Sequence, residues 1–204
     1  MSRRRAIDLV LLPDASTTEC AIDLSEDLLN GRSAKRLILN KQNRLPHISL
    51  AMGVITEDDM QQLTTGLATM AEATHAPTLR TMRIKSQSDP TDAIALVDLE
   101  RTDELLAIHE QAMTLLTPVC SKNVTADDFV DPLPDSSGTI DWVRDFESSA
   151  AYKRFSPHIT LGYGHLPNPA FPEAFLADRL AVCHLGEHCT CSKILFEVSL
   201  QPPK

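Results

Sequence analysis

Two short stretches of the chain are near copies of each other, and each carries a histidine followed two residues later by a hydroxyl. The copies read Pro-His-Ile-Ser-Leu-Ala-Met-Gly at 46–53 and Pro-His-Ile-Thr-Leu-Gly-Tyr-Gly at 157–164. The pairs are therefore His47 with Ser49 and His158 with Thr160. Imidazoles can take up and release a proton near neutral pH, and hydroxyls can donate hydrogen bonds to a charged oxygen. Two such pairs are suited to acid–base chemistry on a phosphodiester.

The spacing within each copy predicts a β-strand. Side chains alternate between the two faces of a strand, so His47 and Ser49 share one face while Ile48 and Leu50 share the other. The second copy repeats this pattern. We expect each strand to bury its isoleucine and leucine in a core and to present its histidine and hydroxyl to a cleft. The proline that opens each copy suits the first residue of a strand, and the glycine that closes it suits the turn that follows.

Basic residues precede both copies and are candidates for binding the substrate: Arg44 before the first copy, and Lys153 and Arg154 before the second. Tyr163 stands where the first copy has Met52, and it is a further candidate for substrate contact. A single His-x-Thr on a strand is usually structural, but two copies with matching flanks favour a catalytic pair. The alternative is an ancient duplication whose site has become a binding surface.

Apolar periodicity and turn residues predict short strands mixed with helices, which favours an α+β fold over a doubly wound parallel sheet. Expected strands cover 6–12, 36–40, 46–53, 79–86, 93–99, 157–163, 180–185 and 193–200, and expected helices cover about 17–30, 56–74, 102–116 and 140–151. A turn at 89–92 predicts an antiparallel hairpin. His109 is expected to be packed and hydrogen-bonded, and Trp142 and Phe146 are expected in the core. Residues 121–139 read as a surface loop, which could cover the cleft.

Composition restricts the partners of this chain of 204 residues. Its formal net charge is −9, which argues against a broad basic surface for long duplex nucleic acid but allows a short RNA 3′ end or a small cyclic nucleotide. No apolar run reaches the length of a membrane span. Because Asp8 and Pro13 interrupt the first apolar run, we interpret it as a strand and not as an export signal. We expect a cytoplasmic protein and leave its oligomeric state open.

The five cysteines are unevenly spread, with three of them in the stretch 183–191 beside two histidines. Reduced thiols in the cytoplasm are the simplest interpretation of this odd number. The spacing within 183–191 matches no standard zinc pattern, because it lacks a paired Cys-x-x-Cys. We therefore expect no metal site and no cofactor.

The paired motif resembles that of the 2H phosphoesterase superfamily, which is named for its two histidines. Within the superfamily it most resembles the 2′-5′ RNA ligase-like and RNA 2′,3′-cyclic phosphodiesterase branch. The likeness covers most of the chain, although only the two motifs are specific. The pattern over 94–100 and the helix after it are also similar. Ser49 departs from the usual threonine but keeps the hydroxyl donor.

This resemblance implies one bilobal domain over residues 1–204, with two pseudo-symmetric lobes, each an antiparallel sheet backed by helices. The two motif strands would lie side by side at the lobe interface, with the active-site cleft between the lobes. The implied activity is a metal-independent phosphodiesterase that hydrolyses a 2′,3′-cyclic phosphate to a 2′-phosphate. His47 and His158 would be the catalytic residues, and Ser49 and Thr160 would bind the phosphate. We take His47 as the acid and His158 as the base, although the two copies are too alike to decide this.

One side activity and two alternatives remain. The same groups could join RNA ends through a 2′-5′ bond, as a side activity. The site could open another cyclic or 2′-5′ linked nucleotide. The chain could also be a non-catalytic module that binds nucleotides or RNA ends, but the presence of both histidines and both hydroxyls speaks against this, since binding alone does not need two bases.

Overall fold

The computed structural model describes residues 2–28, 37–85, 94–134, 137–166 and 169–203, and within these ranges the chain forms seven strands and four α-helices. The strands are β1 (Arg4–Pro13), β2 (Ile48–Thr56), β3 (Thr78–Lys85), β4 (Ile94–Leu99), β5 (His158–Tyr163), β6 (Ala174–Leu185) and β7 (Cys191–Ser199). The helices are α1 (Ala15–Leu28), α2 (Glu57–Ala73), α3 (Asp103–Leu116) and α4 (Gly138–Ala150).

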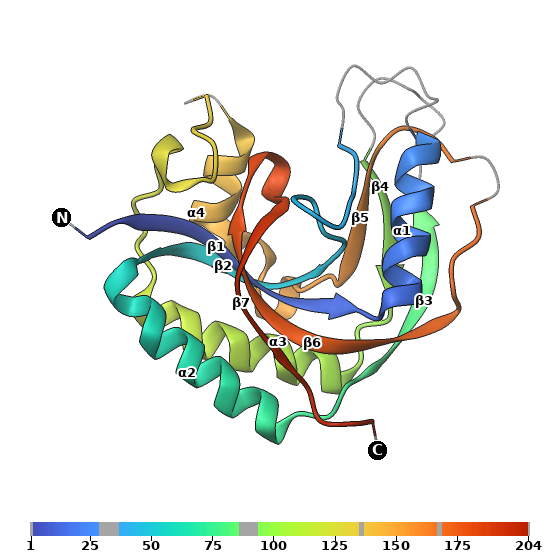
Figure 1. Ribbon diagram of the computed structural model, residues 1–204, viewed down its shortest axis with the longest axis horizontal. Helices are drawn as coiled ribbons and strands as arrows, with labels where there is room; N and C mark the ends of the chain where they lie inside the picture. The colour runs from blue at the N-terminus through green and yellow to red at the C-terminus, as the bar shows by residue number, and fades with distance from the viewer. Residues whose placement is uncertain (1, 29–36, 86–93, 135–136, 167–168, 204) are drawn as a thin grey trace.

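The strands form an antiparallel sheet in the order β2-β1-β6-β3-β4-β5, with β7 paired to the far part of β6 (Figure 1). The long strand β6 belongs to both lobes. Its first residues, Ala174–Leu176, pair with β3, whereas residues from Ala177 onward pair with β1 and β7. The first lobe therefore contains β2, β1, β7 and most of β6, and the second contains the start of β6 with β3, β4 and β5.

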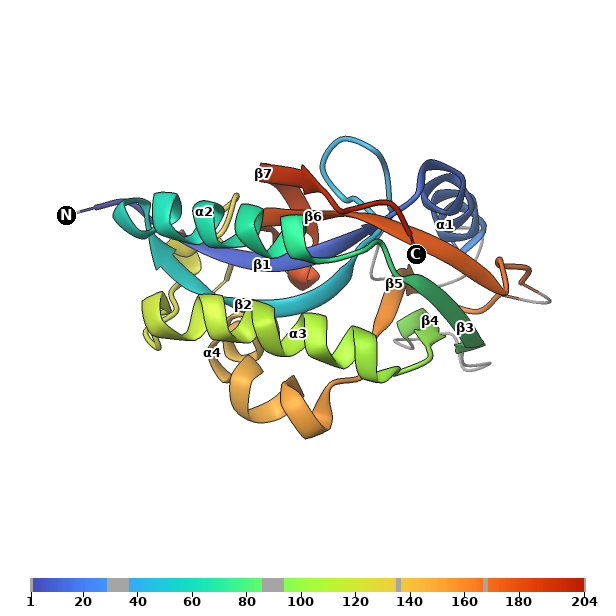
Figure 2. The ribbon, with the colours of Figure 1, turned by 90° about the horizontal axis from the view of Figure 1, so that it is seen from below.

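Each lobe is backed by helices (Figures 1 and 2). In the first lobe α3 and α4 pack against β2, and α2 packs against α3 and β7. In the second lobe α1 packs against β5. Local residues define the helix starts: Asp59 accepts from the backbone N–H of Thr56 at 3.3 Å, and the Thr102 hydroxyl accepts from Leu105 N–H at 3.1 Å. The two-lobed, antiparallel α+β fold expected from the sequence is confirmed.

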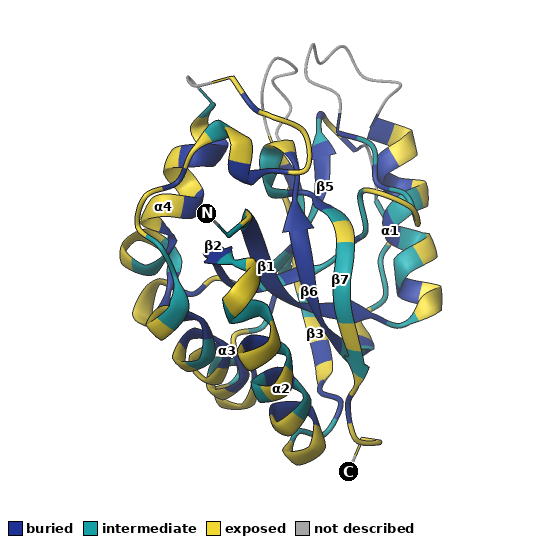
Figure 3. Cartoon of the chain, turned by 60° about the vertical axis from the view of Figure 1, so that its left-hand side comes forward, coloured by how far each residue is buried: buried dark blue, intermediate teal, exposed yellow. Residues whose placement is uncertain are grey.

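Strand β1 is buried on both faces, which explains its continuous apolar run (Figure 3). One face contributes Ile7, Leu9 and Leu11 to the main core beneath the helices. The opposite face contributes Val10 and Leu12 to a smaller apolar cluster with β6 and β7. Alternation places Asp8 on this second face. Asp8 is the only charged residue inside the apolar run from Ala6 to Leu12.

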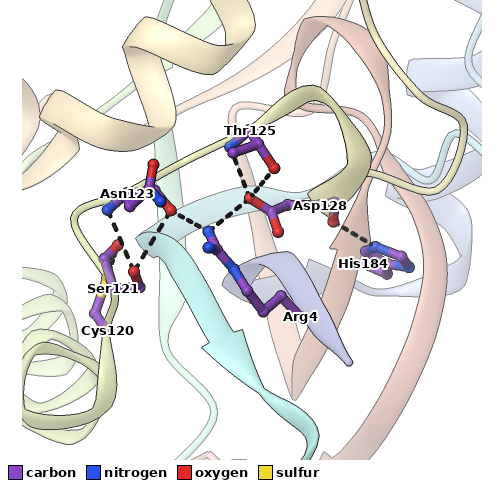
Figure 4. Close-up of polar contacts among 7 residues, drawn as sticks. All are labelled: Arg4, Cys120, Ser121, Asn123, Thr125, Asp128 and His184. Atoms are coloured by element: carbon purple, nitrogen blue, oxygen red, sulfur yellow. Dashed lines mark hydrogen bonds and ion pairs between the residues drawn. The ribbon is translucent and has the colours of Figure 1, made fainter. Parts of the chain in front are cut away.

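A polar network anchors the segment that follows α3 (Figure 4). The Arg4 guanidinium pairs with the Asp128 carboxylate at 2.9 Å, and the backbone N–H of Thr125 donates to the same carboxylate at 2.7 Å. His184 on β6 donates from Nε2 to the Asp128 carbonyl at 2.9 Å. Further along, Val130 N–H donates to the last residue of β6. Residues 121–130 are therefore attached to the first lobe; residues 135–136, also part of the expected loop, lie outside the described ranges.

Several expectations about elements were wrong. Gly53 lies inside β2 and not in a turn, at a point where a Cβ would stand 2.3 Å from Cys120 Sγ. Residues 37–40 form one bridge, Asn40 to Arg44, and no strand. Trp142 is 45% exposed, although Phe146 is buried as expected.

Strand β6 also begins at Ala174, several residues before its expected start at 180. Other expected features cannot be compared with the structure: the turn at 89–92, the last residues of the first helix and the start of the strand at 36–40 lie outside the described residues. The hairpin that this turn would close is present, because β3 and β4 pair antiparallel.

Candidate active site

Both motif histidines are held in the same way. The Nδ1–H of His47 donates to the Leu45 carbonyl at 2.8 Å, and the Nδ1–H of His158 donates to the Ser156 carbonyl at 2.8 Å. Each ring is thus fixed by the carbonyl two residues before it, and each neutral ring keeps its proton on Nδ1. Nε2 is then free to accept a proton when the ring is neutral and to donate one when it is charged.

The two motifs share a backbone irregularity as well as a sequence. The register of β2 against β1 shifts between Ser49 and Ala51, and the register of β5 against β4 shifts between Thr160 and Gly162. A bulge therefore follows the hydroxyl residue in both motifs. Such bulges redirect the side chains that come after them and are common beside active sites. The sequence repeat is accordingly a structural repeat.

The curl of the sheet brings its two end strands together. β2 and β5 contact each other although four strands separate them in the sheet order. The side chain of His47 is only 12% exposed. Burial lowers the pKa of His47, a hydrogen bond to Leu45 raises it, and the charge of a protonated His158 lowers it further. The two histidines are therefore close enough for the charge of His158 to act on His47. Ser49 and Thr160 are both half-buried beside them.

His109, which the sequence predicts to be packed, supports the first motif. It is fully buried on α3, where its Nδ1–H donates to the Leu50 carbonyl at 2.6 Å and its Nε2 accepts from Tyr152 N–H at 2.8 Å. Its ring stacks on Phe155 at 4.0 Å. Both nitrogens are thus occupied by backbone groups, one at the bulge of the first motif and the other shortly before the second. The expectation of a packed, hydrogen-bonded histidine is confirmed.

Sequence reasoning missed Asp8 as a site residue. This carboxyl on β1 is fully buried, and its Oδ2 lies 3.8 Å from Nε2 of His47. Burial raises the pKa of Asp8 well above its ordinary value, and the neighbouring donors, the Ser49 hydroxyl and the amides of Leu50 and Ala51, offset only part of this. In the sequence, the only sign of this role was that Asp8 interrupts an otherwise apolar strand. Its meaning depends on the pairing of β1 with β2, which the sequence does not display.

A second carboxyl stands beside the other histidine. Asp98 on β4 is in register with both His158 on β5 and Arg83 on β3, so the three side chains share one face of the sheet. Asp98 pairs with Arg83 at 2.9 Å and with Lys85 at 2.6 Å. Burial raises the pKa of Asp98, but these two cations outweigh burial and lower it overall. Asp98 is therefore an ionised carboxylate, unlike the buried Asp8.

The β6–β7 hairpin tip, η4 (Glu187–Cys189), contacts the second motif. The Tyr163 hydroxyl and Nδ1 of His188 are hydrogen-bonded at 3.2 Å, and the rings meet edge to face at 5.3 Å. His188 N–H donates to the Thr139 hydroxyl at 3.0 Å. Burial raises the pKa of the Cys189 thiol, and ionisation of the nearby Asp8 would raise it further. Tyr163 and the hairpin tip thus lie next to both motifs.

The cysteines of 183–191 do not all carry free thiols. Cys183 and Cys191 form a disulfide across β6 and β7, so the expectation of reduced thiols is wrong for this pair. That expectation was one of the grounds for a cytoplasmic location. Among the residues that the structure describes, no three histidines, cysteines or acids are grouped to hold a metal ion. Across the same residues, no helix combines the length and apolar character needed to span a membrane.

The basic candidates before the motifs make contacts of other kinds. Arg154 donates to the Ser148 carbonyl at the end of α4 at 2.6 Å. Lys153 is exposed, and its carbonyl accepts from the guanidinium of Arg101 at 3.3 Å. Arg44 is half-buried at the Asn40 bridge. Their role in binding substrate stays a prediction.

Comparison with known proteins identifies the fold. No protein-family model and no curated protein matches the sequence. Among solved structures, LigT of E. coli in its apo form is similar with a TM-score of 0.57 at 12% identity, over 98% of this chain and 99% of LigT. TT0787 of Thermus thermophilus is similar with a TM-score of 0.59 at 11% identity, over 98% of this chain and all of TT0787 (100%).

A further similar structure is described as a phosphoesterase, with a TM-score of 0.54 at 13% identity, over 98% of this chain and 99% of that protein. LigT has also been solved in complex with NADP+, phosphate, 3′-AMP and ATP. At these identities the likeness concerns the fold, which extends over nearly the whole of each chain. The chain therefore has the two-lobed fold of LigT, TT0787 and this phosphoesterase, and its paired motifs resemble those of the 2H phosphoesterase superfamily.

Proposed function

We propose that this chain is a phosphodiesterase that opens a 2′,3′-cyclic phosphate, on an RNA 3′ end or on a nucleotide, and leaves a 2′-phosphate. One observation carries the proposal: two histidines with identical Nδ1 anchors approach each other from opposite ends of the sheet, so that the charge of one lowers the pKa of the other. This arrangement offers two free Nε2 atoms to one substrate.

The pKa of His47 supports a role as the base, which reverses the assignment made from the sequence. A base must be neutral before the reaction, and burial lowers the pKa of His47. His47 then takes a proton from the attacking water through Nε2. His158, protonated, gives its proton to the departing 3′ oxygen of the ribose. The phosphorus–oxygen bond to the water forms while the bond to the 3′ oxygen breaks.

Ser49 and Thr160 complete the proposed mechanism. Their hydroxyls stand two residues after the histidines and donate to the non-bridging phosphate oxygens, where negative charge builds up. Both proton transfers are assigned to imidazoles, so the mechanism does not require metal-bound water. Reverse ligation through a 2′-5′ bond would use the same groups. The complexes of LigT with 3′-AMP, NADP+ and ATP support a nucleotide as the class of substrate.

The test is turnover of 2′,3′-cyclic AMP and of an RNA oligonucleotide ending in a 2′,3′-cyclic phosphate, with the products identified by ³¹P NMR. We expect a 2′-phosphate product, with activity retained after prolonged chelation. Parallel assays use ADP-ribose 1″,2″-cyclic phosphate and 2′-5′ oligoadenylate. Exclusive turnover of one of these would favour the alternative substrates, and binding without turnover would favour a binding module. Activity lost on chelation and restored by zinc or magnesium would contradict the two-histidine mechanism.

A further inference from the structure

Asp8 is a buried acid that does not serve stability in any evident way. Its side chain is fully buried, and no hydrogen bond of good geometry reaches either carboxyl oxygen within the described residues, although the Ser49 hydroxyl and the amides of Leu50 and Ala51 lie close enough to lower its pKa. Burying a carboxyl that neighbouring donors satisfy only weakly costs free energy, and an apolar side chain of similar size would avoid that cost. Asp128, the other enclosed acid of the first lobe, contrasts with it, because Asp128 is bound by Arg4 and Thr125.

Asp8 lies close to each functional part of the first motif. Its Oδ2 is 3.8 Å from Nε2 of His47, the atom that the proposed mechanism uses. The Ser49 hydroxyl and the amides of Leu50 and Ala51, at the bulge, adjoin the same carboxyl. One side chain therefore lies beneath the imidazole, the hydroxyl and the bulge together.

The second motif has no carboxyl in the corresponding place. Asp8 is in register with Met52, five residues after the first histidine, and the residue in register with Tyr163, five residues after the second, is Ile94. The motifs are otherwise alike in sequence, histidine anchoring and bulge. The presence of Asp8 thus makes the two repeated half-sites chemically different. Asp8 lies beside His47, the histidine assigned as the base.

We propose that Asp8 is a positioning residue for His47, whose protonated carboxyl holds the imidazole and the Ser49 hydroxyl in place and keeps Nε2 of His47 free of a fixed negative charge. This inference rests on the proposed function for its kinetic consequences only. The titratable groups facing the pair are His158 from β5 and the Cys189 thiol from the hairpin tip. Cys183, in register with Asp8 on β6, is held in the disulfide and does not titrate.

Two substitutions separate positioning from packing. Asp8→Asn keeps the shape and a neutral polar group but cannot ionise. Asp8→Leu replaces the carboxyl with an apolar side chain of similar size. We expect Asp8→Leu to be at least as stable as the wild type in urea yet to lose roughly 10- to 100-fold in kcat, as removal of a supporting residue commonly does. Asp8→Asn should retain most of the wild-type kcat, with KM little changed in both variants.

The titration of His47 followed by ¹⁵N NMR needs no substrate and keeps the two proposals separable. In the wild type, the His47 ring should show a second inflection from the ionisation of Asp8, because the groups are coupled. Asp8→Asn should remove that inflection. Asp128→Asn is the matched control: it should lower stability by breaking the pair with Arg4 but leave the His47 titration unchanged. If the titration changes while no cyclic phosphate is turned over, the inference about Asp8 stands and the proposed function fails.

Three outcomes would overturn the inference. One is a His47 titration that is the same in the wild type and in Asp8→Asn, which would show that the two groups are not coupled. Another is a folded Asp8→Leu variant with the kcat of the wild type. An Asp8→Asn variant as impaired as Asp8→Leu, with an intact fold, would also contradict it, because the carboxyl would then be needed in its ionised form.

Discussion

At the scale of single residues, chemistry could be predicted from type and spacing, but roles could not. The repeat of histidine and hydroxyl pointed to His47 and His158 from the sequence alone. The two copies are so alike that nothing in them separates acid from base. The difference arises from surroundings: His47 is 12% exposed and lies beside the buried Asp8, a residue from a distant part of the chain. Because burial shifts a pKa, the roles of acid and base could be assigned only from the folded structure.

Replacing either motif histidine should remove one proton transfer. We expect His47→Ala and His158→Ala each to lower kcat on a cyclic phosphate by roughly 10²- to 10⁴-fold, the usual contribution of a general acid or base. Both proteins should remain folded, as judged by circular dichroism. The comparison is His109→Ala, which removes backbone hydrogen bonds in the core and should mainly lower the urea midpoint. Near-normal turnover by either motif variant would refute the mechanism.

The pH profile of turnover should be bell-shaped. The rate requires neutral His47 and protonated His158. Because burial lowers the pKa of His47, activity should fall on the acidic side only below the ordinary histidine value of about 6.5. The apparent values belong to the coupled groups. His47→Ala should therefore erase the acidic limb of the residual activity, and His158→Ala the alkaline limb. The reverse result would restore the assignment made from the sequence, and a flat profile would exclude histidine catalysis.

At the scale of elements, alternation predicted both motif strands but not their bulges. A bulge adds one residue whose effect appears only against the partner strand, so the register shifts after Ser49 and Thr160 left no signal in the sequence. The early start of β6 was missed because prolines crowd the preceding stretch. Gly53 was misplaced for a similar reason: a glycine that avoids a clash with Cys120 looks the same in sequence as one that makes a turn.

Gly162 lies at the bulge of the second motif and should not tolerate a side chain. Its φ is +144°, and a Cβ there would stand 2.8 Å from the carbonyl oxygen of Leu37. We expect Gly162→Ala to lower the free energy of unfolding by more than about 1 kcal/mol, measured in urea. Gly138→Ala is the control, since a Cβ there meets nothing within 4 Å and alanine favours a helix. Equal stability of the two variants would show that the backbone at Gly162 adapts freely.

At the scale of the whole molecule, the family resemblance implied two lobes, yet the way the lobes meet depended on β6. One long strand serves both halves of the sheet, and the curl of that sheet brings β2 and β5 into contact. The disulfide also depends on how the strands pair. Cys183 and Cys191 are neighbours only because β6 and β7 pair as a hairpin, and neither their number nor their spacing revealed it.

Stability should vary with pH in a direction set by buried groups in several parts of the molecule. Burial is the main cause that lowers the pKa of His47, His109 and His184, so the unfolded chain binds protons more readily than the folded one below about pH 6.5. The urea midpoint should therefore fall as the pH is lowered from about 7 toward the folded-state pKa values.

Asp8 acts in the opposite direction, because burial raises its pKa. The unfolded chain loses this proton first, so stability should decline as the pH rises from the ordinary aspartate value of about 3.9 through the folded-state value. Asp8→Asn should remove this decline and leave the acidic fall from the histidines in place. Urea titrations of both proteins across pH 5 to 9 would measure this. Parallel stability curves for the two proteins would mean that Asp8 has the same proton affinity folded and unfolded, against its complete burial.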